Sequence, residues 1–314
     1  MAQVNNLTVT SSMVLGTTTE NTSSAGYMWF DGTNFKYSTS GRVWSTGGAM
    51  INGRSQLGSA TSATQDAALG FSGCNPSVRC TEEYNGTSWS AGGAIITNRF
   101  GIGGSGTQNA GLGIGGDGVT RVSCTEEYNG TSWSTGGGLI QARRYVGAAG
   151  TQNSTVAFGG DTPAYSCTEE YNGSSWSSAT ALPTTRELTA GAGTQNAALS
   201  IGGINPSLFN NTEEYNGSSW SAGGNLPTTL YLSSAAGTQN ATSTFGGVDP
   251  SSPATTTTLH YDGSSWSNNS NLNNGTRSAG GAGTQNCAIS FGGIGNADLS
   301  CTEEYSESIT ACTL

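Results

Sequence analysis

Residues Cys124–Ser134 read CTEEYNGTSWS, and the same eleven letters stand at Cys80–Ser90. The close variants CTEEYNGSSWS and TEEYNGSSWS follow at Cys167–Ser177 and Thr212–Ser221. The stretch combines paired acids, a thiol, two aromatic residues and a glycosylation sequon, as a functional site could. Its recurrence along the chain indicates a structural repeat instead.

Three markers of this repeat share one period. The turn tripeptide Thr-Gln-Asn, or Thr-Gln-Asp in the first copy, recurs in steps of 43 to 46 residues, beginning at Thr64, Thr107, Thr151, Thr194, Thr238 and Thr284. Tryptophan and tyrosine keep the same period, at Trp44, Trp89, Trp133, Trp176, Trp220 and Trp266 and at Tyr84, Tyr128, Tyr171, Tyr215, Tyr261 and Tyr305. Six copies of this length are typical of a propeller, a solenoid or an array.

Each copy consists of short strands. Gly, Ser, Thr and Asn dominate it, and no window has the apolar spacing of a helix, so helical repeats are excluded. In residues 189–221, small residues form a strand that ends at TQN, AALSIGG forms a second and NNTEEY a third, and Asn216-Gly217 turns into a fourth at Trp220. Asn-Gly between strands favours a hairpin. The prediction is an all-β propeller of four-stranded antiparallel blades.

The strand count predicts how the ring closes. The chain begins with an unpaired fourth strand, Trp44–Met50, and ends with a blade, Arg277–Tyr305, that lacks one. Pairing the two gives six blades and removes exposed sheet edges. The alternative is seven blades, the extra one built from Tyr27–Trp44 and the tail Ile309–Leu314. The predicted domains are an attachment segment at 1–36, the propeller at 37–305 and a tail at 306–314.

These residues resemble kelch repeats. In that family a double glycine ends the second strand, a Tyr lies in the third and a Trp opens the fourth. The glycine pairs here are Gly115-Gly116, Gly159-Gly160, Gly202-Gly203, Gly246-Gly247 and Gly292-Gly293, with Ser72-Gly73 in the first copy, and Leu182–Arg186 matches the family's Pro/Arg segment. The resemblance covers roughly residues 37–305. It implies a propeller fold and says little about function, and the step from Tyr to Trp is shorter than in kelch repeats.

A second resemblance lies upstream of the repeats. Residues 13–44 are similar to short segments of tail-fibre and other appendage proteins of bacterial viruses, in which an aromatic-Asp-Gly-Thr-x-Phe-Lys-Tyr sequence leads into a small hairpin. The residues that carry it are Tyr27, Trp29, Phe30, Asp31, Gly32, Phe35, Lys36 and Tyr37. The resemblance implies a protein of the virion, made in the host cytoplasm and extracellular after release, with other virion proteins as partners of the N-terminal segment.

The composition excludes several classes of function. A net charge of −10 argues against nucleic acid as a partner, because binding phosphates needs clustered cations. No apolar run reaches the roughly 18 residues of a membrane span, and the N-terminus lacks the pattern of a secretory signal. None of the seven cysteines lies at a zinc-like spacing, and His260 is the sole histidine. We expect no metal, no cofactor and no membrane insertion, and we leave homo-oligomers open.

The paired acids and the arginines predict an internal ion pair. Adjacent residues on a strand point to opposite faces, so a Glu-Glu pair cannot flank one bond as catalytic carboxylates do. Arginine follows the repeat Trp by ten residues in four copies and by eleven in the sixth. In the fifth copy Leu230 replaces the arginine, and Leu259 and His260 replace the two acids. This joint loss predicts a bridge between first and third strands or across the blade seam, made by Arg54, Arg99, Arg143, Arg186 and Arg277 with Glu82, Glu126, Glu169, Glu213 and Glu303.

The loops between second and third strands differ in every copy, from CNPSVR in the first to VDPSSPATTT in the fifth. In an up-and-down blade these loops share one face with the fourth–first loops, whereas the TQN and Asn-Gly turns share the other. Exposed aromatic and arginine side chains on the variable face are natural binding residues, and ordinary loop drift is the alternative. The candidates are Arg79, Arg121, Arg144, Tyr145, Tyr165, Phe209 and Tyr231.

The expected function is that of a non-enzymatic structural protein of a virion tail or fibre. Its variable loop face would attach to a glycan or protein of the host surface. One alternative is a purely architectural module that docks other virion proteins. Another is a carbohydrate-active enzyme on a propeller, which the absence of recurrent Asp or Glu at the inner ends of first strands disfavours. No catalytic set is identified, and the Asn-Gly-Thr and Asn-Gly-Ser sequons are explained by the hairpin turn.

Overall fold

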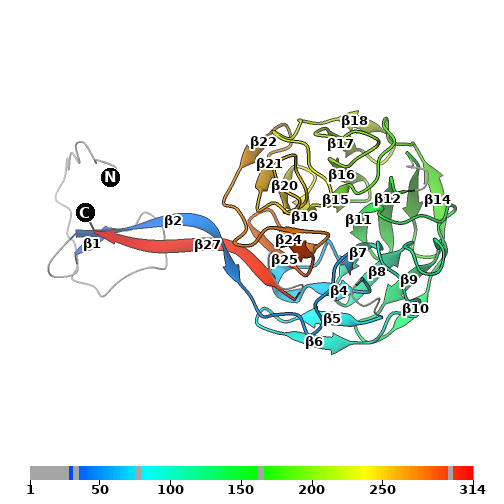
Figure 1. The fold of residues 1–314 in the computed structure, drawn as a ribbon, viewed down its shortest axis with the longest axis horizontal. Coiled ribbons are helices and arrows are strands. Elements are labelled where there is room, and N and C mark those ends of the chain that lie inside the picture. The colour runs from blue at the N-terminus through cyan, green and yellow to red at the C-terminus, as the bar shows by residue number, and fades with distance from the viewer. Residues whose placement is uncertain (1–27, 31–34, 75–78, 162–165, 296–299, 314) are drawn as a thin grey trace. The chain divides into compact units, whose positions relative to one another are not determined.

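The computed structural model describes residues 28–30, 35–74, 79–161, 166–295 and 300–313. The chain divides into two units, one made of Met1–Arg42 with Glu307–Leu314 and the other of Val43–Ser306. The second unit is a β-propeller of six blades, which follow one another around a ring in Figure 1. The predicted all-β fold with six four-stranded antiparallel blades is confirmed.

Blades 1 to 5 each contain four consecutive strands, called first to fourth. Blade 1 has β3 (Gly58–Ser59), β4 (Leu69–Phe71), β5 (Thr81–Tyr84) and β6 (Trp89–Gly92), and blade 2 has β7 (Gly103–Thr107), β8 (Ala110–Ile114), β9 (Thr125–Tyr128) and β10 (Trp133–Thr135). Blade 3 has β11 (Gly147–Thr151), β12 (Ser154–Phe158), β13 (Thr168–Tyr171) and β14 (Trp176–Ala179), and blade 4 has β15 (Ala190–Thr194), β16 (Ala197–Ile201), β17 (Thr212–Tyr215) and β18 (Trp220–Ala222). Blade 5 has β19 (Ser234–Thr238), β20 (Ala241–Phe245), β21 (Thr258–Tyr261) and β22 (Trp266–Asn268).

Blade 6 closes the ring with strands from both ends of the chain. Its first and second strands are β24 (Gly280–Thr284) and β25 (Cys287–Phe291), its third is β27 (Thr302–Thr313) and its fourth is β2 (Phe35–Thr46). The ring of Trp44 lies 5.2 Å from that of Tyr305, as the predicted clasp requires. The seven-bladed alternative is wrong, because these terminal strands extend the sheet of blade 6 instead of forming another blade.

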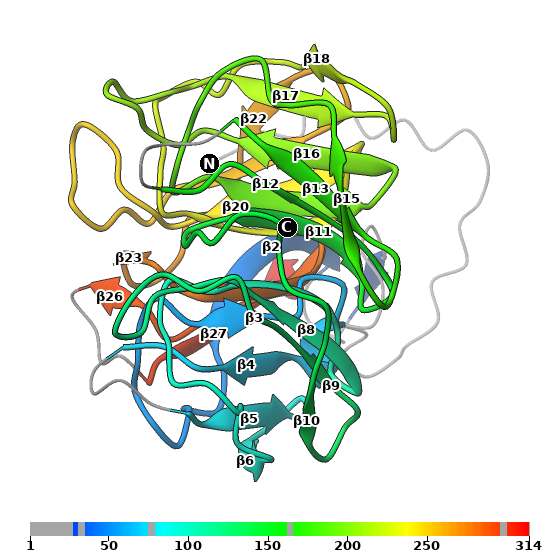
Figure 2. The same ribbon diagram turned by 90° about the vertical axis from the view of Figure 1, so that its right-hand side faces the viewer.

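Strands β2 and β27 contribute residues to both units. In the first unit β1 (Met28–Phe30) pairs antiparallel with β2, and Met28 lies opposite Tyr37. Residues 1–27 and 31–34 of the predicted attachment segment lie outside the described residues, whereas β27 continues through the predicted tail to Thr313. Three further short elements occur in the described residues. They are η1 (Gln65–Ala67), β23 (Thr276–Arg277) and β26 (Ile294–Gly295), and Figure 2 shows the paired β23 and β26 at one side of the ring.

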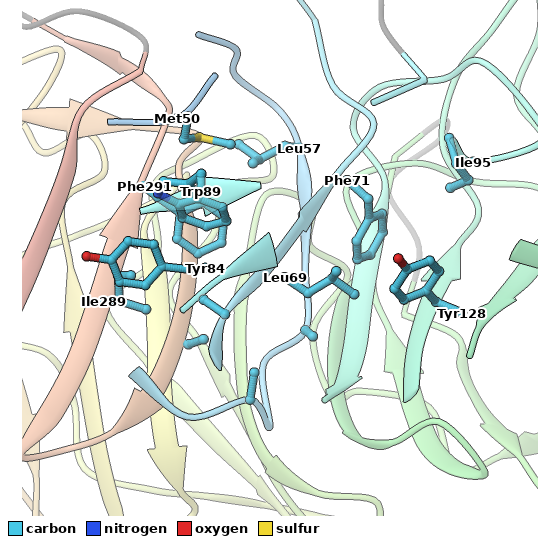
Figure 3. Packing of buried hydrophobic residues seen from close by; sticks show 14 of the residues in the cluster. Met50, Leu57, Leu69, Phe71, Tyr84, Trp89, Ile95, Tyr128, Ile289 and Phe291 are labelled. Atoms are coloured by element: carbon cyan, nitrogen blue, oxygen red, sulfur yellow. The ribbon is translucent and has the colours of Figure 1, made fainter. Parts of the chain in front are cut away.

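Aromatic residues fill the space between blades. In Figure 3, Trp89 of blade 1 lies between Tyr84 of its own blade and Phe291 of blade 6, with ring centroids 5.0 and 4.8 Å away. Every repeat Trp also donates from Nε1 to the threonine that opens the third strand of a preceding blade, at 2.8 to 3.1 Å. The tryptophan is therefore both an apolar wedge and a hydrogen-bond donor, which satisfies the polar atom that its burial removes from water.

The glutamine of each TQN or TQD turn joins one blade to the previous one. Gln108 Nε2 donates to the carbonyls of Ala68 and Tyr84 of blade 1, at 3.1 and 2.6 Å. The same two bonds recur at all six seams, and Gln65 makes them across the ring closure to blade 6. These bonds fix the spacing of the blades and so position the loops on the opposite face.

Candidate functional site: the variable loop face and the axial channel

Four of the predicted Arg–Glu combinations are buried ion pairs. They are Arg54–Glu82, Arg99–Glu126, Arg143–Glu169 and Arg186–Glu213, and their side chains are at most 4% exposed. Arg99 Nη2 lies 3.3 Å from Glu126 Oε1. Each pair lies within one of blades 1–4 and joins the loop that precedes the first strand to the third strand. Burial lowers the pKa of Arg99 and Arg186 and raises that of Glu213.

The same carboxylates hold the loop that leads into each blade. Glu82 accepts hydrogen bonds from the amides of Ile51 and Asn52 at 2.7 and 3.2 Å, and Glu126 accepts the equivalent pair in blade 2. In blade 4 the residue equivalent to Ile51 is Pro183, which has no N–H to donate. The first acid of the repeat therefore holds this loop in place, and the number of loop amides that can donate to it differs between blades.

Blade 6 departs from the predicted pairing. Thr276 occupies the place of Arg54 in the repeat, and Arg277 comes one residue later. Neighbouring residues of an extended chain point to opposite sides, so Arg277 donates to the carbonyl of Pro253 at 3.2 Å, and the pair predicted with Glu303 is not formed. Glu303 instead accepts from Asn274 Nδ2 at 3.1 Å.

Blade 5 replaces the ion pair with an apolar contact. Leu230 and Leu259 are both fully buried and belong to one cluster with Leu226 and Tyr261. This blade also lacks the second acid of the repeat, because His260 stands there.

In blades 1–4 and 6 that second acid accepts a hydrogen bond from the tyrosine of the following blade. Glu83, for example, accepts from the Tyr128 hydroxyl at 2.6 Å. The other donors are Tyr84, Tyr171, Tyr215 and Tyr261. At the seam after blade 5, Tyr305 donates to Asn269 instead, at 2.5 Å.

The Asn-Gly sequons form the third–fourth turns. Asn85 Oδ1 accepts hydrogen bonds from the amides of Thr87 and Ser88 at 3.0 and 2.9 Å, and the equivalent asparagines do the same. The Asn side chain therefore stabilises the turn directly. The Thr, Glu, Tyr and Asn side chains of the repeated TEEYNG motif therefore make hydrogen bonds within the propeller.

On the other face, the loops of each blade lie side by side. The fourth–first loop pairs through its backbone with the residue that follows the glycine pair, as Phe100 does with Asp117 and Arg144 with Asp161. The second glycine also donates to the carbonyl of the residue at the next blade's arginine position, as Gly116 does to Arg143 at 2.9 Å. This face is the variable loop face, and the contacts give it a fixed backbone.

Two of the predicted binding arginines lie in a charged network on blades 2 and 3. Arg144 reaches Asp117 through Nη1 and Asp161 through Nε, each at 2.8 Å. Arg121 Nε lies 3.2 Å from Asp161 Oδ1. Both guanidinium groups are thus paired with aspartates, and the network joins the second–third loops of the two blades.

Aromatic rings complete this network. The Arg144 guanidinium carbon lies 4.7 Å from the ring centre of Tyr145 and 5.9 Å from that of Phe100. Burial raises the pKa of Tyr145. Glu187 on blade 4 also has a raised pKa, because burial and, secondly, the charge of Asp161 disfavour its ionised form.

The remaining candidates lie apart from this network. Arg79 on blade 1 is exposed and donates to the Ile95 carbonyl at 2.6 Å. Phe209 on blade 4 lies 5.1 Å from the Arg186 guanidinium, and Tyr231 on blade 5 is half-buried beside Val248. Tyr165 lies outside the described residues. The structure therefore brings together Arg121, Arg144 and Tyr145 and disperses the others around the face.

A ring of six equivalent residues surrounds the propeller axis at this face. They stand two residues after the position that holds the repeat arginine in blades 1–4 and have φ between 54° and 59°. They are Gln56, Gly101, Tyr145, Leu188, Leu232 and Ser278. Their amides donate to the carbonyl of the preceding blade's ring residue at 2.7 to 3.0 Å in five of the six steps. Left-handed backbone costs a non-glycine residue about 1 kcal/mol or more. The hydrogen bonds from blade to blade offset this strain and hold the ring rigid.

The ring encloses the mouth of an axial channel. The six ring residues and their six successors line a cavity of about 100 Å³. The successors are Leu57, Ile102, Val146, Thr189, Ser233 and Ala279, and they also line a second, deeper cavity of about 100 Å³. Glycines of the first strands, such as Gly104 and Gly191, form much of the deeper wall.

An insertion in blade 1 lies across the other end of the channel. Five residues separate Gly58 from Thr64, whereas three separate Gly103 from Thr107 in blade 2. The extra residues include Ser62, whose amide donates to Gly106 of blade 2 at 3.0 Å and whose hydroxyl donates to Gly150 of blade 3 at 2.8 Å. The channel therefore opens towards the variable loop face.

Sequence reasoning missed three features of this face. Asp117 and Asp161 open second–third loops and were not connected with the arginines, although both follow the glycine pair. The left-handed ring left no signal in the sequence, because Gln, Gly, Tyr, Leu and Ser all occupy the position. The insertion in blade 1 was visible as two extra residues before Thr64, but its place across the axis depends on the closed ring.

No group of three or more His, Cys, Asp or Glu residues in the described part of the chain could hold a metal ion. Among the same residues there is no helix of the length and apolarity that would cross a membrane. Comparison of the chain with protein-family models and with curated proteins gave no match.

Proposed function

We propose that the chain is a non-enzymatic structural protein of a bacterial virus, a tail or fibre component that presents the variable loop face to a glycan or protein of the host surface. The N-terminal segment joins it to other virion proteins. The protein is made in the host cytoplasm and becomes extracellular with the released particle. Neither nucleic acid nor a membrane is a partner in this proposal.

The proposal rests on the difference between the recurrent structural residues and the variable loop face. The recurrent polar residues make contacts inside blades or across seams, as Glu82 with Arg54 and Glu83 with Tyr128 illustrate. The second–third loops differ in every copy although the scaffold beneath them repeats. Variable loops on a rigid frame are a common arrangement for recognition.

The non-enzymatic part rests on the carboxylates. In blades 1–4 the first acid is neutralised by an arginine and the second accepts from a tyrosine, as in Glu126 with Arg99 and Glu127 with Tyr171. Such groups are not free to transfer protons to a substrate. Turnover of a bacterial polysaccharide by the purified protein would contradict this part.

The kelch character of the blades and the virion setting rest on sequence. The glycine pairs have left-handed φ, as the values of 58° and 111° at Gly115 and Gly116 illustrate, and they lie against the next blade as a kelch-like repeat requires. The virion setting rests on the resemblance of the residues around Trp29–Tyr37 to appendage segments, and β1 and β2 pair there in a hairpin.

Two measurements test the proposal. Immunogold labelling of intact particles with an antibody to the propeller should decorate a tail or fibre. Preincubation of host cells with purified protein should then reduce adsorption of the particles. Labelling without competition would favour the architectural alternative, in which the face docks another virion protein, and particles without label would overturn the virion assignment.

A further inference from the structure

The axial channel has two unlike walls. At the level shared by the two cavities, blades 1–3 contribute Leu57, Ile102 and Val146, whereas blades 4–6 contribute Thr189, Ser233 and Ala279. At this level one half of the channel is therefore apolar and the other half carries small and hydroxyl side chains. A ligand that fits both halves needs an apolar side and a polar side.

Among the residues that the structure describes, no charged side chain lines either cavity. The residues of the deeper wall are mostly Gly, Ala, Ser and Thr, so the peptide groups of the first strands are close to the lumen. A carboxylate or phosphate would lose its hydration here without meeting a cation. A purely apolar ligand would leave nearby hydroxyl and peptide groups without water or another partner. The lining suits an uncharged molecule with several hydroxyl groups.

The mouth adds groups that can orient such a molecule. Tyr145 Oη donates to Gln56 Oε1 at 3.0 Å, above Gly101, which has no side chain to fill the space. The Nε2 donors of Gln56 are not used in this contact. Because the ring residues are fixed by hydrogen bonds between blades, these groups are held in place before a ligand arrives.

The size of the channel limits what enters. Two adjoining cavities of about 100 Å³ each exceed the space of a single water, and a single cavity of about 150 Å³ is known to admit benzene. At the far end Ser62 is hydrogen-bonded to blades 2 and 3, which narrows the channel there. A chain end is the part of a larger molecule that fits.

We propose that the axial channel binds the terminal sugar of an uncharged glycan, inserted from the variable loop face between the apolar wall of blades 1–3 and the hydroxyl wall of blades 4–6. The inference rests on the attachment function proposed above and names the ligand class for it. The described second–third loops of blades 2, 4 and 5 then contact the sugars that follow the terminal one.

The internal repeats supply variants that block the channel with tolerated residues. Ala279 is equivalent to Leu57, and Ser233 is equivalent to Ile102, so Ala279→Leu and Ser233→Ile put residues into blades 5 and 6 that blades 1 and 2 already accommodate. Ala222→Leu is the matched control, because Ala222 is exposed on β18 and the variant makes the same change outside the channel. Gln56→Leu tests the mouth, since Leu188 shows that leucine is accepted at this ring position.

Saturation-transfer NMR with the full chain measures binding of methyl glycosides of glucose, galactose, mannose and N-acetylglucosamine, with glucuronate as the charged comparison. At least one neutral glycoside should bind, and Ala279→Leu/Ser233→Ile should weaken it at least tenfold while Ala222→Leu leaves it unchanged. Gln56→Leu should weaken it by a smaller factor. Absence of binding by every neutral glycoside, or binding that survives the blocked channel, overturns the proposal.

The same variants separate this inference from the attachment function. If the wild-type protein competes with particle adsorption and the folded blocked variant competes equally well, the channel proposal fails and attachment stands. If neutral glycosides bind in the channel but the protein neither labels particles nor competes, the channel site stands and its role in attachment fails. If the double variant does not fold, Ala279→Leu and Gln56→Leu are measured singly against the same criteria.

Discussion

In blade 2 the buried Arg99 meets Glu126, whereas in blade 5 the same two positions hold Leu230 and Leu259. The sheets around them match, because Glu126 lies opposite Gly113 and Leu259 opposite Thr244, the equivalent second-strand residue. Replacing a buried ion pair by apolar residues is often neutral or stabilising, while removing one partner leaves an uncompensated buried charge. The comparison indicates that the two side chains must match, and that an Arg–Glu ion pair and a pair of leucines are both accepted here.

The largest effect is expected from breaking one pair. Glu126→Leu should lower the free energy of unfolding by about 3–5 kcal/mol, because Arg99 is fully buried and loses its carboxylate. Urea unfolding followed by tryptophan fluorescence measures the change. The double variant Arg99→Leu/Glu126→Leu gives blade 2 the two leucines of blade 5 and should recover part of the loss, because the amides of Ile96 and Thr97 still lose their acceptor. A double variant less stable than the single one would show that blade 5 depends on other differences.

The reverse exchange tests the same rule in blade 5. Leu259→Glu should cost about 3–5 kcal/mol at neutral pH, because a carboxylate is buried without a cation. Burial raises the pKa of such a group, so its penalty should shrink as the pH falls and the carboxyl is protonated. Adding Leu230→Arg should restore stability at pH 7. Urea unfolding at pH 4.5 and 7 checks both, and equal losses at the two pH values would contradict the charge argument.

Most of the fold could be predicted because its determinants are local and repeated six times. The Asn-Gly turn, the TQN turn and the spacing of Tyr and Trp define the strands of one blade, and the unmatched Trp44 strand predicts the clasp. The joint replacement of Arg and Glu in blade 5 pointed to the ion pair for the same reason. Blade 5 differs from the other copies at both positions at once, so it acts as a natural double substitution.

The candidate site was harder to predict because it depends on contacts between blades. Arg121 and Arg144 were expected on the loop face, but their partners Asp117 and Asp161 come from two different blades. The Arg277–Glu303 pair was predicted from the repeat positions of the two residues, and a shift of one residue prevents it. The channel is lined by two residues from each blade at its mouth, so no single repeat contains it.

A smaller effect is expected at the seams between blades. Tyr128 donates to the carboxylate of Glu83, whereas Tyr305 donates to the amide oxygen of Asn269. Hydrogen bonds to charged groups contribute about 1.5–3 kcal/mol and neutral ones about 0.5–1.5 kcal/mol. Tyr128→Phe should therefore destabilise the protein more than Tyr305→Phe in urea unfolding. Equal losses would show that the charge of the acceptor does not matter at these seams.

The smallest effect is a change of stability at alkaline pH. Burial and, secondly, the bond to a glutamate raise the pKa of Tyr128 and of Tyr171 to about 12. The unfolded chain then releases its tyrosine protons first, near pH 10, so the contribution of these groups is complete below pH 10 and is lost as the pH rises towards 12. Urea unfolding at pH 8, 9.5 and 11 should show wild type losing more stability than Tyr128→Phe, and Tyr171→Phe should match that variant. Because the seam bond requires a protonated hydroxyl, identical losses in all three proteins would mean that these tyrosines ionise alike in both states and that the bond to glutamate does not hold their protons.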